Sequence, residues 1–410
     1  MKINLKDIEK IVIDKIDTLR DDIVKFHQEI VRIPSENPPS KYKPIAEFTE
    51  TKMKEIGLTT QIKRGNTVGE FQGGDGHSLI FYGHYDTVEV FKGWSKKPFG
   101  GEIIDGKIYG RGSSDDKSSV TAEIFATQAL IESNVELNGK LTLTAVGDEE
   151  TGGYAGIEYL LSKGIVKGDV CLLGDAPYGY PIGYCGGGMF PSFTIKGKQA
   201  HGMGFPDLPT PYRSEHSGIN AIQRMVEIMN FLLTIKKELN AKETKYPQTG
   251  HWTTNVSDVN LAVIEGGTKI SIVPDRCLLH TSVNTIPEQD IESLKQRILN
   301  FVEKMKQEDP LLDITVQIPI AYEPQIINAD SNFAKSVKGA FKSVFKEERD
   351  YKLFLPTTDA HWFQEKGIDT ILIGATRSDN KAHAEDEFVY IDDLIDITKI
   401  FALTALNYLK

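Results

Sequence analysis

Three consecutive acidic residues, Asp148, Glu149 and Glu150, are the strongest chemical feature of the sequence. They follow residues 140–146, whose alternating and β-branched side chains predict a β-strand. Carboxylates at the end of a buried strand are costly unless they are paired, hydrogen-bonded or bound to a metal ion. Glu149 and Glu150 could therefore divide two tasks, one binding a cation and the other moving a proton. A solvated acidic turn is the alternative interpretation of the same residues.

Further side chains that could bind a metal ion come after other predicted strands, directly or by a loop: His84, Asp86, Asp175 and His383. Asp115 lies at the start of a predicted helix, where a plain helix N-cap is the alternative role. In open α/β sheets, sites lie outside the carboxyl ends of the strands. Imidazole and carboxylate ligands without a thiolate are typical of zinc or a similar first-row ion. The spacing of His84 and Asp86 lets Asp86 accept the second ring N–H of the histidine and select the tautomer that binds metal.

Charge and composition restrict the partners and the compartment. A net charge of −11 over 410 residues argues against nucleic acid or an anionic membrane surface as a partner. No apolar run approaches the roughly 20 residues of a membrane-spanning helix, and the charged N-terminus lacks the apolar core of a signal peptide. Three cysteines provide no disulfide framework and suit a reducing compartment. We therefore expect a cytoplasmic protein.

The predicted elements that position these residues fall into two patterns. Between residues 78 and 174, a β-α-β-α-β order predicts an α/β fold with a mixed, mostly parallel sheet flanked by helices. Between residues 189 and 319, a β-α-β-β-α-β order is typical of a ferredoxin-like α+β unit. The length of the chain also favours two domains. We predict an inserted lid domain, residues 187–321, within a discontinuous catalytic domain, residues 1–186 and 322–410.

Short motifs along nearly the whole chain make it resemble a known family. It is similar to the di-zinc amidohydrolases and exopeptidases of peptidase clan MH, which include acetylornithine deacetylase, succinyl-diaminopimelate desuccinylase, aminoacylase, carnosine dipeptidase and the glutamate carboxypeptidases. The resemblance is carried by residues 35–39, 83–87, 94, 98–99, 105–112, 115–117, 148–150, 197–201, 218–221 and 382–387.

The resemblance implies a role for each candidate residue. His84, Asp115 and Asp175 would hold one divalent metal ion, and Asp115, Glu150 and His383 would hold a second, with zinc, cobalt or manganese all suited to these ligands. Glu149 would be the general base, and Asp86 would support His84. His201 on the lid would help to stabilise the tetrahedral oxyanion, across a dimer interface in many family members. Lid closure is expected to bring His201 to the carbonyl.

The sequence also departs from the family pattern. Many members carry an arginine that binds the carboxylate of the substrate where this chain has Asn284. Arg377 or Arg213 could replace it, or the substrate could lack a carboxylate at that place. The segment 205–216 is longer than is typical, and a substrate-facing loop and a surface decoration both fit it. Residues 357–361 are expected to lie near the substrate without binding metal.

These observations favour a metallohydrolase that cleaves the amide bond of a small N-acylated amino acid or amine. A metallo-exopeptidase, either a dipeptidase or a carboxypeptidase, is the alternative, because residues 115–117 also match peptidase-like relatives. A catalytically inactive binding protein on the same fold is a third hypothesis, against which the intact Glu149 and the five ligand positions argue. We expect a homodimer that forms through the lid.

Overall fold

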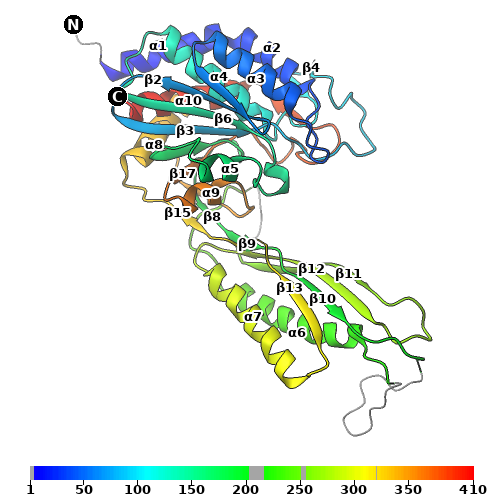
Figure 1. Cartoon of the computed structure of the whole chain (residues 1–410). Coiled ribbons are helices and arrows are strands. Elements are labelled where there is room, and N and C mark those ends of the chain that lie inside the picture. Colours follow the sequence, from blue (N-terminus) through cyan, green and yellow to red (C-terminus); the bar gives the residue numbers. More distant parts are fainter. Residues whose placement is uncertain (1–3, 203–216, 251–254, 320) are drawn as a thin grey trace.

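The computed structural model of the chain describes residues 4–202, 217–250, 255–319 and 321–410. Figure 1 shows a main body, built from the N-terminal and C-terminal parts of the chain, and a projecting body built from the middle part. The main body therefore consists of two segments that are distant in sequence but folded together. The predicted domain boundaries near residues 187 and 321 stay a prediction.

The central sheet of the main body has nine strands, in the order β1-β2-β6-β3-β7-β17-β8-β15, with β16 paired to β8. Strands β6, β3, β7 and β17 are parallel to one another, as the β-α-β-α-β pattern predicted, and β1, β2 and β15 add antiparallel pairs. The strands are β1 (Thr59–Lys63), β2 (Asn66–Gln72), β3 (His77–His84), β6 (Gly139–Val146), β7 (Val170–Leu173), β8 (Ile182–Cys185), β15 (Gln325–Ile326), β16 (Lys352–Phe354) and β17 (Asp369–Leu372).

Alternating side chains attach helices to both faces of this sheet. In β3, Leu79 and Phe81 join one buried cluster, whereas Ile80 and Tyr82 join the other. The first cluster lies under α1 (Leu5–Thr18), α2 (Arg20–Val31), α3 (Lys43–Glu55), α4 (Lys117–Glu132), α8 (Asn332–Phe345) and α10 (Ile391–Tyr408). The second lies under α5 (Ile157–Ser162) and α9 (Ala360–Glu365).

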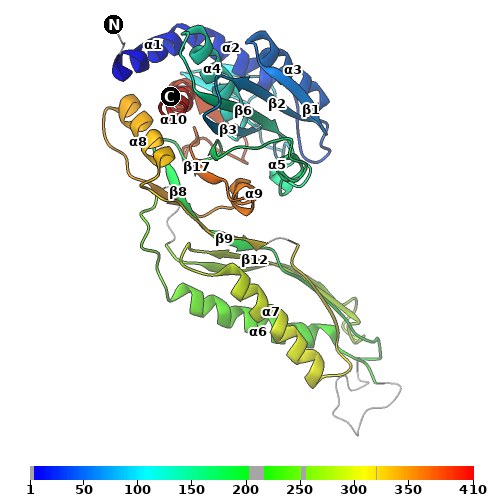
Figure 2. The same cartoon turned by 60° about the vertical axis from the view of Figure 1, so that its left-hand side comes forward.

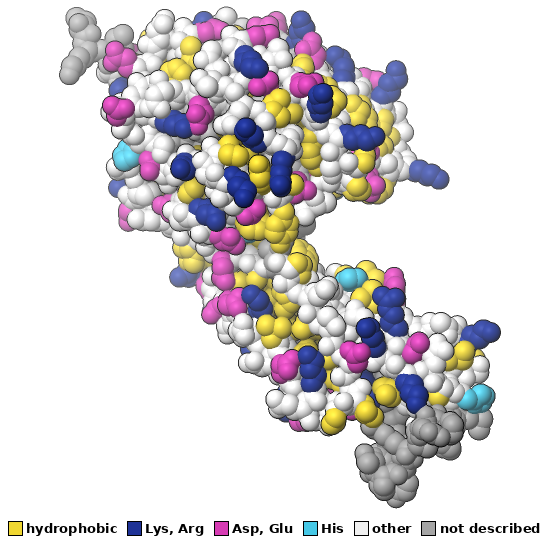
Figure 3. Space-filling model, in the orientation of Figure 1, with side chains coloured by type: hydrophobic (Ala, Val, Ile, Leu, Met, Phe, Trp, Pro, Cys, Tyr) yellow, Lys and Arg dark blue, Asp and Glu magenta, His cyan; other side chains and the backbone are white. Residues whose placement is uncertain are grey.

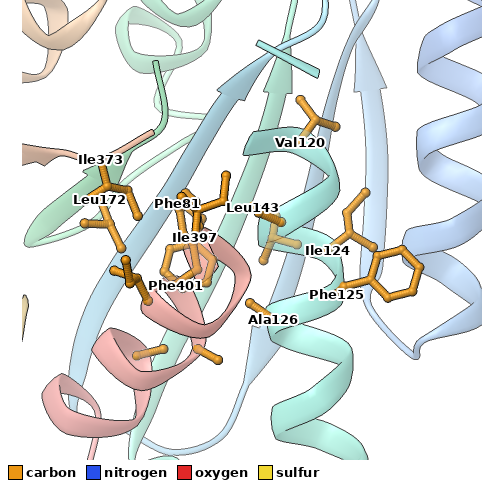
Figure 4. Packing of buried hydrophobic residues seen from close by; sticks show 14 of the residues in the cluster. Phe81, Val120, Ile124, Phe125, Ala126, Leu143, Leu172, Ile373, Ile397 and Phe401 are labelled. Carbon is orange, nitrogen blue, oxygen red and sulfur yellow. The ribbon is translucent and has the colours of Figure 1, made fainter. Parts of the chain in front are cut away.

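The first cluster holds α4 and α10 against the sheet, as Figure 4 shows. The rings of Phe81 and Phe401 meet edge to face with their centroids 4.8 Å apart. Helix α4 is buried on nearly all sides, which is typical of a helix surrounded by other elements rather than one with a solvent face. The N-terminus of α4 is thereby fixed beside the carboxyl ends of the parallel strands.

The projecting body contains a six-stranded sheet with two helices on one face (Figure 2) and a hydrophobic cluster of its own. The antiparallel order β13-β10-β12-β11 and the chain order β-α-β-β-α-β are ferredoxin-like, as predicted. Its elements are β9 (Gly187–Met189), β10 (Ser192–Lys196), α6 (Ala221–Asn240), β11 (Asp258–Gly266), β12 (Arg276–Thr285), α7 (Ile291–Glu308), β13 (Asp313–Gln317) and β14 (Ala321–Tyr322).

Several short strands were not predicted from the sequence. β4 (Glu102–Ile104), β5 (Lys107–Tyr109) and β18 (Phe388–Tyr390) form a small separate sheet in the order β18-β5-β4. Strands of three residues carry no detectable periodicity. β4 and β5 pair as a local hairpin, and β18 joins them from a distant part of the chain. Among the described residues, no helix is long and apolar enough to cross a membrane.

Candidate metal centre

The predicted ligands come from the carboxyl ends of adjacent parallel strands. His84 ends β3, Glu150 lies in the short 3-10 helix Glu149–Thr151 after β6, and Asp175 follows β7. Because β6, β3 and β7 are neighbours in the sheet, their carboxyl ends lie side by side at one edge. Asp115 lies just before α4, and His383 lies in the loop between β17 and β18.

The structure brings all five predicted ligands together in two groups that share Asp115. His84, Asp115 and Asp175 form one group and Asp115, Glu150 and His383 the other, with one ligand atom from each residue within 4.8 Å of the others. Asp115 Oδ1 lies 3.2 Å from His84 Nε2, and Asp115 Oδ2 lies 3.1 Å from His383 Nε2. The two oxygens of one carboxylate therefore face two different histidines.

The donor set fits two divalent cations. His84 Nε2 is buried and has no hydrogen-bond partner, although Asp115 Oδ1 lies 3.2 Å away. A buried ring nitrogen without a partner is costly unless it binds something. Burial, with repulsion from Asp115, also raises the pKa of Asp175 well above its ordinary value. Divalent ions would use the free nitrogen and compensate the crowded carboxylates.

Hydrogen bonding among the ligands sets opposite pKa shifts. Burial alone would raise the pKa of Asp115, but the imidazole rings of His383 and His84 beside its carboxylate hold it below the ordinary value. Hydrogen bonds to Asp115 and Glu150 raise the pKa of His383 to about 11. His383 thus carries a proton at neutral pH when no cation is bound, and this proton must leave when the ring binds metal.

Asp86 supports the site differently from the prediction. His84 Nδ1 bonds to the backbone carbonyl oxygen of Asp86 at 3.1 Å, and the nearer carboxylate oxygen is 3.4 Å away. The carboxylate instead accepts the Asn37 side-chain amide at 3.1 Å and the backbone N–H groups of Glu149 and Glu150, each at 3.2 Å. Asp86 therefore holds the acidic turn in place as well as lying against His84.

Glu387 positions Asp115 through its backbone. This fully buried carboxylate accepts a hydrogen bond from Arg111 Nη1 at 2.7 Å. It also accepts the backbone N–H groups of Gly112, Ser114 and Asp115 at 3.0–3.1 Å. The sequence offered only the family motif as a signal for Glu387, because its partners lie more than 270 positions away.

The neighbouring acids have separate structural roles. Asp116, rather than Asp115, is the N-cap of α4, accepting the N–H of Ser119 at 3.3 Å. Asp148 accepts the hydroxyl of Thr151 at 2.7 Å and the N–H of Ala155 at 2.6 Å. The carboxylate of Asp148 therefore closes the turn through hydrogen bonds within the protein. For this residue, the interpretation of residues 148–150 as a solvated acidic turn is wrong.

Glu149 faces open space beside the ligand groups. It lines a cavity of about 570 Å³ and an adjoining one of about 440 Å³, both also lined by His383. Burial, reinforced by the Asp175 carboxylate and opposed by His84, raises the pKa of Glu149 well above its ordinary value. Thr357 and Thr358 line both cavities, consistent with the prediction that residues 357–361 lie near the substrate.

His201 is not brought to the ligands. It lies in the projecting body, where its backbone forms a β-bridge with Ile272, and it lines neither cavity. The physical reason is that residues 197–202 belong to the projecting body, whereas the ligands lie at the carboxyl ends of strands in the main body. The approach of His201 to the ligands would therefore require movement of the projecting body or a partner chain.

Arg377, Arg213 and Asn284, the residues relevant to binding a substrate carboxylate, differ in their surroundings. Arg377 lines the larger cavity, but its guanidinium forms two hydrogen bonds with Asp393, at 2.5 and 2.6 Å. Asn284 lies on β12 between Asp258 of β11 and Gly188 of β9. Arg213 and the segment 205–216 lie outside the described residues.

Comparisons with known proteins agree with this geometry. The model of peptidase family M20/M25/M40 matches residues 80–407. An uncharacterised metallohydrolase of Methanocaldococcus jannaschii is 28% identical, over 93% of this chain and 98% of the relative. A probable succinyl-diaminopimelate desuccinylase of Staphylococcus aureus is 26% identical, over 88% of this chain and 91% of the relative. The crystal structure of human carnosine dipeptidase 1 shares the fold, with a TM-score of 0.72, 19% identity and 98% coverage of both chains. The chain belongs to peptidase family M20/M25/M40 and is a metallohydrolase that acts on amide bonds.

Proposed function

We propose that this enzyme removes the acyl group from a small N-acylated amino acid or amine, using two divalent metal ions, zinc ions in the first instance. The observation that carries the proposal is the double ligand group around Asp115, with Glu149 on the wall of the same cavity. Similarity to a probable succinyl-diaminopimelate desuccinylase over most of the chain supports an N-acyl substrate. The net charge of −11 supports a small-molecule substrate rather than nucleic acid.

The ligands have assigned roles in this proposal. His84 and Asp175 would hold one ion, Glu150 and His383 would hold the other, and Asp115 would bridge them. When bound, the ions polarise the scissile carbonyl and make the attacking water more acidic. Because the oxygens of Glu150 are committed to metal binding, Glu150 is unavailable as a base.

Glu149 is proposed to move the proton. Its carboxylate faces the cavity and is next to Glu150 without belonging to either ligand group. It would take a proton from the attacking water and deliver it to the leaving amine, which is general acid–base catalysis by one carboxyl group. A raised pKa suits this task, because a catalytic acid–base group works best near the ambient pH. The carboxylate of Asp86 supports Glu149 by accepting the backbone N–H of Glu149.

The projecting body is proposed to act as a lid and as the surface of a homodimer. Closure would expel water from the cavity and bring His201 to the oxyanion, from the same chain or from the partner subunit. A cytoplasmic location is also proposed, because Cys171, Cys185 and Cys277 are all buried and unpaired.

A metallo-exopeptidase is the second candidate. The observation that favours it is the similarity of fold to human carnosine dipeptidase 1 across 98% of both chains. A dipeptide and an N-acyl amino acid present the same amide to the metal ions, so the ligand geometry suits either. The two candidates differ in whether the site must accommodate a free α-amino group.

A substrate panel and one variant test the proposal. The zinc-, cobalt- and manganese-loaded enzymes are assayed against N-acetyl, N-formyl and N-succinyl amino acids beside dipeptides. Turnover of dipeptides alone would replace the deacylase assignment with the second candidate. Glu149→Gln is expected to keep two metal ions and lose about 10²–10⁴-fold in kcat. Full activity of this variant would rule out Glu149 as the base, and activity that survives complete metal removal would overturn the mechanism.

A further inference from the structure

Two adjoining cavities flank the proposed reaction centre. The larger, about 570 Å³, and the smaller, about 440 Å³, are both lined by Glu149, Glu150 and His383. A substrate whose amide lies at these shared residues would therefore extend one part into each cavity. The linings differ in chemistry, so we name the larger the cationic lobe, after Arg377 and Lys381, and the smaller the aromatic lobe, after Tyr154, Phe190 and Tyr322.

The cationic lobe is built on a loop that Asn380 holds in one conformation. The fully buried Asn380 side chain accepts the backbone N–H of Arg377 and donates to the carbonyl oxygen of Phe388. The N–H of Phe388 in turn donates to the carbonyl oxygen of Asn380 at 3.0 Å. The same loop carries His383, a proposed metal ligand. The backbone of Lys381, two positions before it, is held by this loop.

The charges of Arg377 and Lys381 are compensated differently. Arg377 Nε and Nη2 bond to both oxygens of Asp393, and the Arg377 guanidinium packs 4.6 Å from the ring of Tyr178. Lys381 is exposed and lines the lobe, and within the described part of the chain its side chain forms no ion pair or hydrogen bond.

With two divalent ions bound, the four carboxylates that line the cationic lobe (Asp115, Glu149, Glu150 and Asp175) would be balanced in charge. The ammonium group of Lys381 would then be the uncompensated charge of this lobe. An unpaired cation on the wall of a cavity attracts an anionic ligand group. Arg377 Nη1, which has no hydrogen-bond partner among the described residues, belongs to the second cation that lines this lobe.

The aromatic lobe presents rings instead of cations. Tyr154 and Phe190 line this lobe and are 44% and 42% exposed. The Phe190 ring lies edge to face with Tyr322, with centroids 6.1 Å apart, and Tyr154 Oη donates to the carbonyl oxygen of Pro319 at 3.3 Å. Figure 3 shows hydrophobic side chains gathered where the two bodies meet. Rings exposed around a cavity favour an apolar or aromatic ligand group.

From these two lobes we infer that the substrate carries a carboxylate on one side of the scissile amide and an apolar ring on the other, with Lys381 as the residue that selects the carboxylate. The inference rests on the proposed amidohydrolase function and adds the substrate class. It requires that recognition of the anion depends on Lys381 rather than on the metal ligands alone.

Two pairs of matched compounds test the inference in both orientations of the amide. N-benzoylglycine and the monobenzylamide of succinic acid each carry a ring and a carboxylate, on opposite sides of the amide. N-benzoylglycinamide and N-benzylsuccinamide are their neutral counterparts. Dissociation constants are measured by calorimetry on the zinc-loaded Glu149→Gln enzyme, so that binding is observed without turnover.

One acid of the two pairs is expected to bind at least about tenfold more tightly than its neutral counterpart. Lys381→Gln should remove this preference and leave the dissociation constant of the neutral compound within about twofold. Lys366→Gln, which changes an exposed lysine outside both lobes, is the matched control and should change neither. Equal binding of acid and amide, equal weakening of both by Lys381→Gln, or no binding of either acid would overturn the inference.

The ring is tested separately. Phe190→Ala should weaken N-benzoylglycine or the succinic acid benzylamide several-fold more than the corresponding methyl compounds, N-acetylglycine and N-methylsuccinamic acid. An equal effect on ring and methyl compounds would overturn the aromatic assignment.

Failure of the proposed function has a different signature. Selective, Lys381-dependent binding of an acid that the active enzyme does not hydrolyse would overturn the amidohydrolase proposal and keep the subsite. Hydrolysis of these compounds without a preference for the acids would keep the amidohydrolase proposal and overturn the carboxylate subsite.

Discussion

The carboxylate of Asp86 accepts the backbone N–H of Glu149 at 3.2 Å, so a residue at the end of one parallel strand holds the proposed base at the end of the next. The same carboxylate accepts the N–H of Glu150, and Asp86 is fully buried. One side chain therefore sets the backbone position of both the proposed base and a proposed ligand. Because Asp86 holds the backbone of both glutamates, their side chains can serve two different proposed roles.

Replacing Asp86 should disturb both tasks. Asp86→Asn keeps the size of the side chain but offers one oxygen where two accepted N–H groups. We expect a loss of about 10–100-fold in kcat/KM or in metal affinity, which is the usual effect of removing a residue that orients metal ligands. Steady-state kinetics and metal analysis on the purified variant measure these quantities. Asp75→Asn, in an exposed turn, is the control, and wild-type values for Asp86→Asn would contradict the prediction.

Glu387→Gln should destabilise the loop that carries Asp115. The buried ion pair with Arg111 would lose its anion, and the N–H groups of Gly112, Ser114 and Asp115 would compete for a single amide oxygen. Breaking a buried pair typically costs about 3–5 kcal/mol of unfolding free energy. Denaturant titration of the variant measures the loss.

The neighbouring exposed residue provides the control for this substitution. Glu385→Gln changes the same type of side chain two positions earlier and should leave the unfolding free energy within about 0.5 kcal/mol of wild type. A Glu387→Gln protein as stable as Glu385→Gln would show that the pair with Arg111 contributes nothing.

Stability should fall in acid because of His27. Burial is the main reason that the pKa of His27 is lowered from 6.5 to about 3, so the folded protein keeps this ring neutral. The unfolded chain takes up a proton below pH 6.5 and the folded chain does not. The stabilising contribution is therefore complete above pH 6.5 and is lost as the pH falls toward 3, by about 1.4 kcal/mol per pH unit.

The pH dependence can be assigned with one substitution. His27→Gln should remove this part of the slope in the unfolding free energy between pH 6.5 and 4, whereas His77→Gln, on an exposed histidine, should leave it unchanged. Identical slopes for wild type and His27→Gln would show that other groups cause the acid sensitivity.

Metal removal should destabilise the main body. Ligands that bind only the folded state stabilise it by about 4 kcal/mol at a thousand times the dissociation constant. Zinc at saturating concentration should therefore raise the melting temperature by roughly 5–10 °C over the chelator-treated protein. Calorimetry with and without chelator measures the shift. In His383→Ala, which lacks one proposed ligand, the shift should be smaller, and a full shift there would exclude His383 from metal binding.

The sequence by itself determined the α/β fold, the ferredoxin-like unit and the family, because these depend on local periodicity and short motifs. It also named His84, Asp115, Glu150, Asp175 and His383 as the residues to examine. Local patterns suffice for such predictions, since a ligand at a strand end is recognisable from the strand that precedes it.

Only the tertiary structure decided which side chains pair with which. Asp86 holds the turn of Glu149, Glu387 holds the loop of Asp115, and Arg377 is paired with Asp393. The short strand β18 likewise forms because folding brings it beside β5, which is distant in the sequence. The physical reason is the same in each case: a buried carboxylate or an unpaired strand takes the partner that folding brings near, and no local pattern along the chain specifies that partner.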